Sequence, residues 1–421
     1  MVRKKRIVVL GAGFAGMHVI QGLMKEPELK THELVLVDRN AFHLYTPDLY
    51  EVATAFNLSQ DQCPRDEVQL RETIATPLSS LIDLKRVRFI QDEVIGVSAS
   101  SRKIKLKTQG DLDYTVLVVA LGSVPHFFNI PGLEQYALPL KTLRDGLSIH
   151  STLKKLFCSG EMKSRKNLTF AIGGGGPTGI EMAAELAGAL DHFSAVYGVP
   201  RKKLKTYLIE ASDQLASLGK KGTTRIKNHF DVLGVGLYLN HRILKLKKKS
   251  VMVQPEKGKS KELPFDFFVW TGGVQVNPMV TQSLGSPTLR GAIEVNPFLQ
   301  MKTNESIFAA GDNAFILDPS SNKPLPMLAQ LAYTQGDLVA KNIIRFIRKQ
   351  PLKPYRPSSP VWVIPIGGRV ALLKVGSLVI SGFFCWMLRR FISFRYLSTV
   401  LPFFRAVSMW WKGNRIFMKN D

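Results

Sequence analysis

The sequence predicts an α/β fold of two similar units with parallel sheets, the second inserted in the first, followed by amphipathic C-terminal helices. Three observations lead to this prediction. An apolar stretch, a glycine-rich turn and a helical pattern follow one another near the N-terminus. The same succession returns after residue 167. Residues 351–421 differ from the rest of the chain because they are basic and aromatic.

The composition is that of a globular protein with an unusual charge. The 421 residues are 45% hydrophobic and include 57 Lys and Arg against 33 Asp and Glu, a formal net charge of +24. This length suits two or three domains. The positive charge favours contact with a polyanion, either nucleic acid or an anionic membrane. The three cysteines are far apart, which excludes neighbouring redox cysteines and a cysteine-rich metal site, so we expect no metal.

The first unit begins with the pattern G-x-G-x-x-G, formed by Gly11, Gly13 and Gly16 between a strand and a helix. The first glycine permits a tight turn, the second lets the backbone approach a pyrophosphate, and the third lets the helix pack on the strand. Asp38 ends the next strand, where a carboxylate accepts hydrogen bonds from ribose hydroxyls. With Ala15 in the turn, these residues are candidates for binding a dinucleotide. The strands expected in this unit are residues 7–10, 34–37, 87–90, 104–106 and 117–120, the last closed by Gly122.

The second unit repeats this arrangement with Gly174, Gly176 and Gly179, and with Glu210 at the end of the following strand. A carboxylate at that position binds a ribose 2′-hydroxyl and repels a 2′-phosphate, which favours NADH over NADPH. Gly272 follows a further strand and is another candidate for the same site. The elements expected here are strands at 168–172, 206–209 and 267–270, and a helix at 180–190.

The order of these elements predicts the domain boundaries. The first domain is formed by two parts of the chain, and the second is inserted between them. One dinucleotide in each unit implies a pair of redox partners, because the cofactors supply the hydride chemistry that side chains lack. The predicted domains are 1–125 and 285–350 for the first unit, 126–284 for the inserted unit, and 351–421 for a C-terminal region.

Eight segments resemble the type II NADH:quinone oxidoreductases, a family of two-dinucleotide-binding flavoproteins with Rossmann-like domains. The resemblance covers nearly the whole chain. It implies that the first unit binds FAD and the second binds NADH, and that electrons pass to a membrane quinone of a respiratory chain without proton pumping. The segments are GAGFAG (11–16), FHLYTPDLYEVAT (42–54), LDYTVLVVALGS (112–123), GGGPTGIEMAAELAG (174–188), LIEA (208–211), FVWTGGVQVNP (268–278), IFAAGDNA (307–314) and AQLAYTQG (329–336).

The resemblance also implies roles for single residues. Gly311 and Asp312 follow a strand at 307–310 and resemble the second FAD signature, in which the aspartate accepts from the ribityl chain. Glu181 matches a glutamate near the contact of nicotinamide and flavin, where it orients the nicotinamide or handles protons. The alternative is a carboxylate that is only stabilised by a helix N-terminus.

A segment of the next expected helix, which begins near Pro326, resembles the quinone-site motif AQxAxQ. Ala329 and Gln330 match the beginning of the motif, and glutamines there can hydrogen-bond a quinone carbonyl beside the flavin. Thr334 occupies the usual place of the second glutamine, and Gln335 follows one residue later. An ordinary amphipathic helix is the alternative.

The C-terminal region predicts contact with a membrane surface. From residue 341 onward there are fifteen Lys or Arg and one acidic residue. The longest apolar stretch, 375–388, is shorter than the roughly twenty residues that span a bilayer. At helical spacing, an apolar face lies opposite a face with Arg389, Arg390 and Ser393, which is typical of a helix in the membrane interface. Packing on the FAD domain and a dimer contact are alternatives. The apolar face contains Phe384, Met387, Leu388, Phe391 and Ile392.

These observations together predict a peripheral, monotopic membrane protein on the cytoplasmic face of the inner or plasma membrane. Residues 380–421 would contact the anionic surface, a homodimer is possible, and no nucleic-acid module is visible. Two other functions stay open. A sulfide:quinone oxidoreductase would need a cysteine pair at the flavin. A flavoprotein like apoptosis-inducing factor would act mainly as an NADH-responsive interaction protein. His43, alone in a loop, is expected to be structural.

Overall fold

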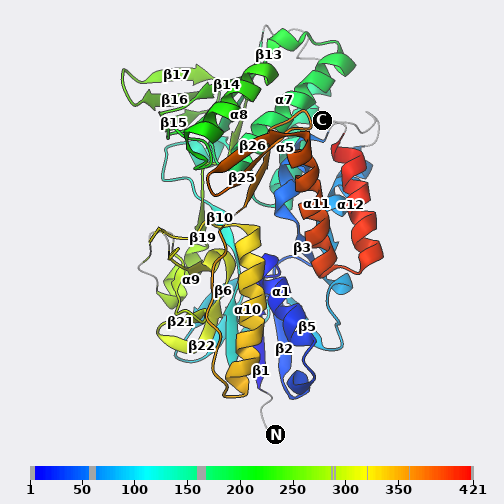
Figure 1. Cartoon of the computed structure of the whole chain (residues 1–421), viewed down its shortest axis with the longest axis vertical. Coiled ribbons are helices and arrows are strands. Elements are labelled where there is room, and N and C mark those ends of the chain that lie inside the picture. The colour runs from blue at the N-terminus through cyan, green and yellow to red at the C-terminus, as the bar shows by residue number, and fades with distance from the viewer. Residues whose placement is uncertain are drawn as a thin grey trace. The chain divides into compact units, whose positions relative to one another are not determined.

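The computed structural model of the chain divides into two compact units (Figure 1). Unit 1 contains Met1–Leu44, Ala75–Val124 and Val274–Pro360, and unit 2 contains Tyr45–Ile74, Pro125–Gly273 and Val361–Asp421. Each unit has its own parallel sheet, which confirms the predicted fold class of two similar α/β units followed by C-terminal helices. The structure describes residues 5–55, 63–158, 167–285, 288, 291–319, 321–359 and 361–418.

Unit 1 is built on a six-stranded sheet with the order β21-β22-β9-β1-β2-β5. All its pairings are parallel except that of β21 with β22. The central strand β1 is fully buried from Ile7 to Leu10, as expected for a parallel sheet that is covered on both faces. The strands are β1 (Arg6–Leu10), β2 (Glu33–Asp38), β5 (Val87–Gln91), β9 (Val116–Val119), β21 (Gln300–Met301) and β22 (Asn304–Ala309).

Two helices of unit 1 pack side by side, α1 (Phe14–Met24) and α10 (Ala329–Ile347). Gly336 allows their close approach, because a Cβ atom at this position would lie 2.4 Å from the backbone oxygen of Ala15. A second, antiparallel sheet and α9 (Pro278–Leu284) share a core with the main sheet. That second sheet contains β6 (Val94–Ser98), β7 (Lys103–Leu106) and β8 (Gly110–Asp113).

Unit 2 is built on a five-stranded parallel sheet with the order β11-β18-β12-β13-β14. The longest helix, α7 (Pro177–Tyr197), follows β12 directly and packs on this sheet. An antiparallel sheet of β15 (His241–Lys247), β16 (Ser250–Pro255) and β17 (Lys261–Pro264) extends from it (Figure 1). The strands of the main sheet are β11 (Leu138–Pro139), β12 (Leu168–Gly173), β13 (Leu204–Ile209), β14 (Val235–Tyr238) and β18 (Phe267–Trp270).

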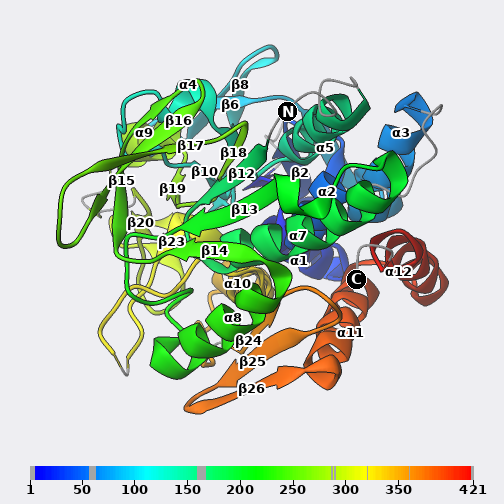
Figure 2. The same ribbon diagram turned by 90° about the horizontal axis from the view of Figure 1, so that it is seen from above.

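The C-terminal region of unit 2 is a three-stranded antiparallel sheet followed by two helices, which lie beside one another in both views (Figures 1 and 2). The apolar stretch 375–388 is therefore divided between a hairpin and a helix. Gly376, with a φ of 56°, makes the turn of this hairpin. The elements are β24 (Trp362–Pro365), β25 (Ala371–Val375), β26 (Leu378–Gly382), α11 (Phe383–Val400) and α12 (Phe403–Phe417).

Shorter helices and strands connect these layers. Within unit 2, α2 packs against α5 and α7, and α3 packs against α12. The remaining helices are α2 (Leu49–Thr54), α3 (Cys63–Ile74), α4 (Leu133–Tyr136), α5 (Leu143–Cys158) and α8 (Gly219–Leu233), with 3-10 turns at Pro27–Thr31, Thr46–Asp48, Leu78–Ser80, Arg201–Lys203 and Gly311–Asn313. The remaining strands are β3 (Phe42–Leu44), β4 (Ala75–Pro77), β10 (Ser123–Pro125), β19 (Val274–Val276), β20 (Ile293–Glu294) and β23 (Ala314–Phe315).

The packing of α1 on α10 gives a testable prediction. Gly336→Ala places a methyl group 2.4 Å from a backbone oxygen, so we expect a loss of about 1–3 kcal/mol in the free energy of unfolding. Gly413→Ala in α12 is the matched control, because its new Cβ would meet its nearest atom at 3.4 Å. There the higher helix propensity of alanine should stabilise by about 0.5–1 kcal/mol. Urea unfolding followed by circular dichroism measures both, and equal shifts of the same sign would contradict the prediction.

Candidate functional site

The glycine turn of unit 1 connects β1 to α1 and has the geometry expected for phosphate binding. Gly11 has a φ of 97°, and a Cβ atom there would lie 2.3 Å from the oxygen of Ala120. A Cβ atom at Gly16 would lie 1.8 Å from the oxygen of Gly11, so both positions require glycine. At Gly13 nothing lies within 4 Å of the corresponding point. Open space therefore faces the backbone at the N-terminus of α1, where a pyrophosphate would be bound.

The turn of unit 2 between β12 and α7 repeats this geometry. Gly174 has a φ of 106°, and a Cβ atom there would lie 2.3 Å from Cα of Gly272. A Cβ atom at Gly179 would lie 1.9 Å from the oxygen of Gly174. At Gly176, the equivalent of Gly13, nothing lies within 4 Å. Gly272 thus belongs to this turn because it lets the end of β18 approach it.

The carboxylate of Asp38 holds the first turn in place. Its Oδ2 accepts a hydrogen bond from the backbone N–H of Ala12 at 2.7 Å, and its Oδ1 accepts one from Asn40 at 2.7 Å. Burial raises the pKa of Asp38, and these two backbone hydrogen bonds oppose that rise. Each carboxylate oxygen retains acceptor capacity for a further hydroxyl donor. The buried His43 bonds through Nδ1 to the oxygen of Ala12 at 2.8 Å, and burial lowers its pKa to about 4, so it is a neutral structural residue.

Glu210 has the same relation to the second turn. Its Oε2 accepts from the backbone N–H of Gly175 at 2.6 Å, and its Oε1 accepts from Ser212 at 2.8 Å. In both units, therefore, an acid at the end of the second strand binds the N–H that follows the first glycine and another N–H two residues beyond the acid. The two turns are duplicates in their hydrogen bonding as well as in their sequence pattern.

The ends of β9 and β22 bring further candidate residues of unit 1 together. Gly122 donates its N–H to Oδ1 of Asn313 at 2.8 Å, and Ser123 donates its hydroxyl to Asp312. A Cβ atom at Gly311 would lie 3.5 Å from Cβ of Ala15. Because β22, β9 and β1 are adjacent parallel strands, these residues and the first glycine turn lie at the same edge of the sheet.

The two glutamines of α10 have different surroundings. Gln335 is buried and its Oε1 accepts from the N–H of Gly311 at 2.7 Å, so this amide fixes the end of β22. Gln330 is only partly buried, as is Ala329 at the start of the helix. In the part of the chain that the structure describes, the side chain of Gln330 makes no hydrogen bond and is available to a ligand. The hydroxyl of Thr334 contacts the oxygens of its own helix and lies 3.3 Å from that of Tyr355.

Glu181 lies in the N-terminal part of α7 and is partly buried. Burial raises its pKa to about 8; Arg389 opposes this shift, and the charges of Asp48 and Glu51 add to it. The carboxyl group is therefore mostly protonated at pH 7. Among the described residues it accepts no hydrogen bond from the N-terminus of its helix.

The groups that surround Glu181 form a buried charged cluster between α11 and the segment 45–51. Arg389 donates to the carboxylate of Asp48 at 2.8 Å, to the oxygen of Pro47 at 3.0 Å, and to the hydroxyl of Ser393 at 2.5 Å. Tyr45 donates to the same Ser393 hydroxyl at 3.1 Å. Both partners of the Arg389–Asp48 pair are nearly enclosed, with 7% and 13% of their side chains exposed.

A second pair extends this cluster. Arg390 donates to Glu51 at 2.7 Å, and the hydroxyl of Tyr50 donates to the same carboxylate oxygen at 3.1 Å. The guanidinium group of Arg390 also lies over the ring of Trp386. Sequence reasoning missed Asp48 and Glu51. The available signal was their spacing of three residues, which puts both acids on one side of a short helix.

This cluster corrects one expectation about the C-terminal helix. Arg389 and Arg390 do lie opposite the apolar face of α11, but they point into unit 2 and are paired with acids rather than being available to lipid. The apolar face is the exposed one, because Phe384 is 83% exposed and Phe391 is 57% exposed.

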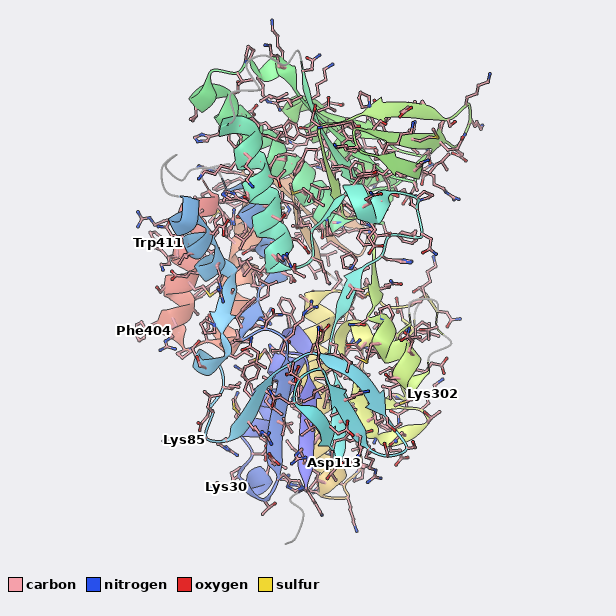
Figure 3. The ribbon with its side chains drawn as sticks, turned by 180° about the vertical axis from the view of Figure 1, so that it is seen from behind. Lys30, Lys85, Asp113, Lys302, Phe404 and Trp411 are labelled. Carbon is pink, nitrogen blue, oxygen red and sulfur yellow. The ribbon has the colours of Figure 1, made fainter. Side chains whose placement is uncertain are left out.

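The exposed apolar surface continues on α12. Phe404 is 85% exposed and Trp411 is 60% exposed, and both lie at the outer side of this helix (Figure 3). We call the exposed apolar side chains of α11 and α12 the aromatic stripe. It contains Phe383, Phe384, Met387, Leu388, Phe391, Ile392, Phe403, Phe404, Val407 and Trp411. Within the described ranges, every helix is too short or too polar to cross a bilayer.

In the described part of the chain, His, Cys, Asp and Glu side chains form no group of three that could hold a metal ion. Cys385, a residue of α11, is buried with a free thiol. The chemical features of the two units are the glycine turns with their acids and the buried charged cluster around Glu181.

Comparisons with known proteins agree with this arrangement. The model of the pyridine nucleotide-disulphide oxidoreductase family matches residues 5–336. The type II NADH:quinone oxidoreductase of Staphylococcus aureus is 26% identical over 356 residues, which cover 84% of this chain and 85% of that protein.

Solved structures show the same fold. The structure of NDH2 from Plasmodium falciparum in complex with NADH has a TM-score of 0.83 at 18% identity, and the match covers 99% of this chain and 97% of that one. The sulfide:quinone oxidoreductase from Aquifex aeolicus has a TM-score of 0.77 at 18% identity, with 94% and 91% covered. At these identities the similarity is one of fold.

The buried ion pair of α11 gives the prediction of this subsection. Arg389→Met removes the partner of a nearly enclosed carboxylate, so we expect the free energy of unfolding to fall by about 3–5 kcal/mol. Asp48→Asn on that background removes the unpaired charge and should restore a large part of the loss. Urea unfolding of the two single variants and the double variant measures this coupling. Additive effects of the two substitutions would show that the pair does not interact.

Proposed function

Because the chain belongs to the pyridine nucleotide-disulphide oxidoreductase family, we propose that it is an FAD-dependent NADH:quinone oxidoreductase. The observation that carries this proposal is the duplicated turn. Each unit has an open backbone position at a helix N-terminus and a carboxylate that binds the turn, which is what a dinucleotide requires. The similarity to the Staphylococcus aureus enzyme supports the choice of NADH and quinone.

We assign FAD to unit 1. Its glycine turn, Asp38 and the pair Gly311–Asp312 meet at one edge of the sheet, and the open space at Gly13 fits a pyrophosphate. Gln335 contributes by holding Gly311 rather than by contacting a quinone. Bound FAD would supply the chemistry of accepting a hydride and passing on electrons. We place its residues within the proposed FAD domain, 1–125 and 285–350.

We assign NADH to the inserted domain, 126–284, in unit 2. Gly174, Gly176 and Gly179 would bind the pyrophosphate, and Glu210 would accept from the ribose hydroxyls of the adenosine half. The same carboxylate would repel the 2′-phosphate of NADPH. Gly272 allows the turn to close against β18.

Quinone reduction consumes two protons, and Glu181 is the group that we propose to hold one of them. Its raised pKa keeps it protonated at neutral pH, as a general acid requires. Gln330 would orient a quinone carbonyl, because its amide is not engaged among the described residues. Thr334 would not replace the second glutamine of the motif, since its hydroxyl already contacts oxygens of its own helix.

The aromatic stripe is the surface that we propose to enter the membrane interface, where a lipid-soluble quinone is found. Arg395 and Arg405 are exposed on the same two helices and would reach anionic headgroups. We propose a monotopic protein on the cytoplasmic face that is held at the membrane through this stripe.

A stopped-flow experiment on the purified holoprotein tests the proposed function. NADH should bleach the oxidised flavin, NADPH should do so more slowly, and a soluble quinone should then restore the absorbance rapidly. Bleaching by sulfide but not by NADH would identify a sulfide:quinone oxidoreductase. A long-lived charge-transfer absorbance with slow reoxidation by quinone would identify an NADH-responsive interaction protein.

The pKa of Glu181 predicts a pH dependence of the quinone half-reaction. The group holds its proton below about pH 8 and loses it as the pH rises through that value, so the rate of reoxidation by quinone should fall there. Glu181→Gln should lower this rate by about 100-fold or more at pH 7 and remove the step near pH 8. Glu134→Gln, the same change at an exposed residue, is the control. A step that persists in Glu181→Gln would exclude this residue as the proton donor.

The aromatic stripe predicts that membrane binding can be removed without unfolding the protein. Replacing Phe384, Phe391, Phe404 and Trp411 with serine should weaken co-sedimentation with anionic liposomes by about 100-fold or more, because each aromatic contributes roughly 1.5–3 kcal/mol when buried. Val232→Ser in α8 is the control, since Val232 is 81% exposed but lies outside the stripe. Unchanged sedimentation of the fourfold variant would contradict the proposed docking surface.

A further inference from the structure

The antiparallel sheet β15–β17 of unit 2 is strongly basic. Its inner face is apolar, with Ile243, Leu246, Val251 and Val253 packed in the core of unit 2. Its basic side chains are all exposed. We call residues 241–264 the basic ribbon. It has eight cations, Arg242, Lys245, Lys247, Lys248, Lys249, Lys257, Lys259 and Lys261, against the two acids Glu256 and Glu262.

A large part of this charge is not neutralised within the chain. Lys247 pairs with Glu262 at 2.9 Å, and Lys249 lies 3.7 Å from Asp266. Six cations form no ion pair in the part of the chain that the structure describes: Arg242, Lys245, Lys248, Lys257, Lys259 and Lys261, the last of which lies over the ring of Tyr238. The ribbon therefore presents a positive field to solvent.

One end of the ribbon adjoins the loop that contains Glu210. The N–H of His241 donates to the backbone oxygen of Glu210 at 2.9 Å, and the N–H of Asn240 donates to Ser212 at 3.0 Å. The N–H of Glu256 donates in turn to Asn240 at 2.9 Å. The segment with Lys257 and Lys259 is thus connected to the proposed ribose-binding loop by two successive hydrogen bonds, through Asn240.

The other end of the ribbon lies farther away. The turn that joins β15 to β16 follows a seven-residue strand, so it is about 20 Å from His241. The Debye length is about 8 Å at physiological ionic strength. Cations near the Glu210 loop can therefore act on a nucleotide there, whereas Lys245 and Lys248 toward the far end are largely screened.

We propose that the near end of the basic ribbon attracts the phosphates of the incoming dinucleotide and opposes part of the rejection of a 2′-phosphate by Glu210. This inference rests on the proposed function of unit 2 as the NADH-binding unit. Attraction at this distance acts mainly on the rate of association, which charged clefts raise by roughly 10- to 1,000-fold. NADPH carries more negative charge than NADH and would gain more from the ribbon. Discrimination between the two coenzymes then depends on two opposing interactions of the 2′-phosphate, its repulsion by Glu210 and its attraction by the basic ribbon.

Two charge-matched variants of the holoprotein separate the near end from the far end. The near variant is Lys257→Gln with Lys259→Gln, and the far variant is Lys245→Gln with Lys248→Gln. The measurement is the association of NADH and NADPH, by titration of coenzyme fluorescence and by the second-order rate of flavin bleaching, at low and at high salt. At low salt the near variant should lower the affinity for each coenzyme and the second-order rate of bleaching by roughly 3- to 10-fold, with a larger loss for NADPH. At high salt the near variant and the unchanged protein should behave alike. The far variant should change them less than about twofold.

The outcomes distinguish this inference from the proposed function. Equal effects of the near and far variants, or association that does not depend on salt, would overturn the role of the ribbon. The same protein would be mixed with anionic vesicles and with RNA. Loss of vesicle or RNA binding in both variants, with coenzyme association unchanged, would also overturn it and assign the ribbon to that polyanion. Coenzyme binding without any bleaching of the flavin would instead refute the proposed oxidoreductase and leave the ribbon's role standing.

Discussion

The hydrogen bond from an acid to a glycine turn is the constraint on which both proposed nucleotide sites depend. Asp38 binds the N–H of Ala12, and Glu210 binds that of Gly175. The bond requires the acid to end a strand that is paired in register with the strand before the turn, as in the pairings of β1 with β2 and of β12 with β13. Once this register is set, the backbone N–H groups beyond the turn point outward at a helix N-terminus, where a phosphate is stabilised.

This local character explains how much the sequence could predict. Each glycine turn and its acid lie within a few tens of residues of one another, and the strand, turn, helix and acid follow in a fixed order that the sequence pattern indicates. The pairing of Arg389 with Asp48 has no such pattern, because the partners are distant in sequence. Asp48 lies in a segment noted only for its family resemblance, and Arg389 lies in a helix expected to contact a membrane. Helical spacing showed which residues of α11 share a face. It could not show which face is buried. An apolar face can be buried in a core, and an arginine face can also be buried when acidic side chains of the neighbouring segment pair with the arginines.

The orientation of α11, with its aromatic face exposed and its arginines buried, has energetic consequences. Leaving large aromatic side chains in water forgoes a stabilisation of about 1.5–3 kcal/mol for each of them. Burying Arg389 and Arg390 beside Asp48 and Glu51 contributes little net stability, because desolvation offsets the Coulomb attraction. Such pairs fix the orientation of the helix. A rotation that buried the aromatic side chains would remove the arginines from Asp48 and Glu51 and leave these buried acids unpaired. The fold of unit 2 thus holds an apolar surface outward that water alone would not favour, and the proposed contact with a membrane interface would compensate for it.

The same charges surround Glu181, so the position of α11 and the proton affinity of this carboxyl group are coupled. Arg389 lowers the pKa of Glu181, whereas burial and the charges of Asp48 and Glu51 raise it. If α11 left its place, the acids would lose their partners, and Glu181 would lose both its shielding from water and its neighbouring cation. The cation that opposes the rise in the pKa of Glu181 thus belongs to α11. The proposed role of Glu181 as a proton donor at neutral pH therefore depends on α11 as well as on its own helix.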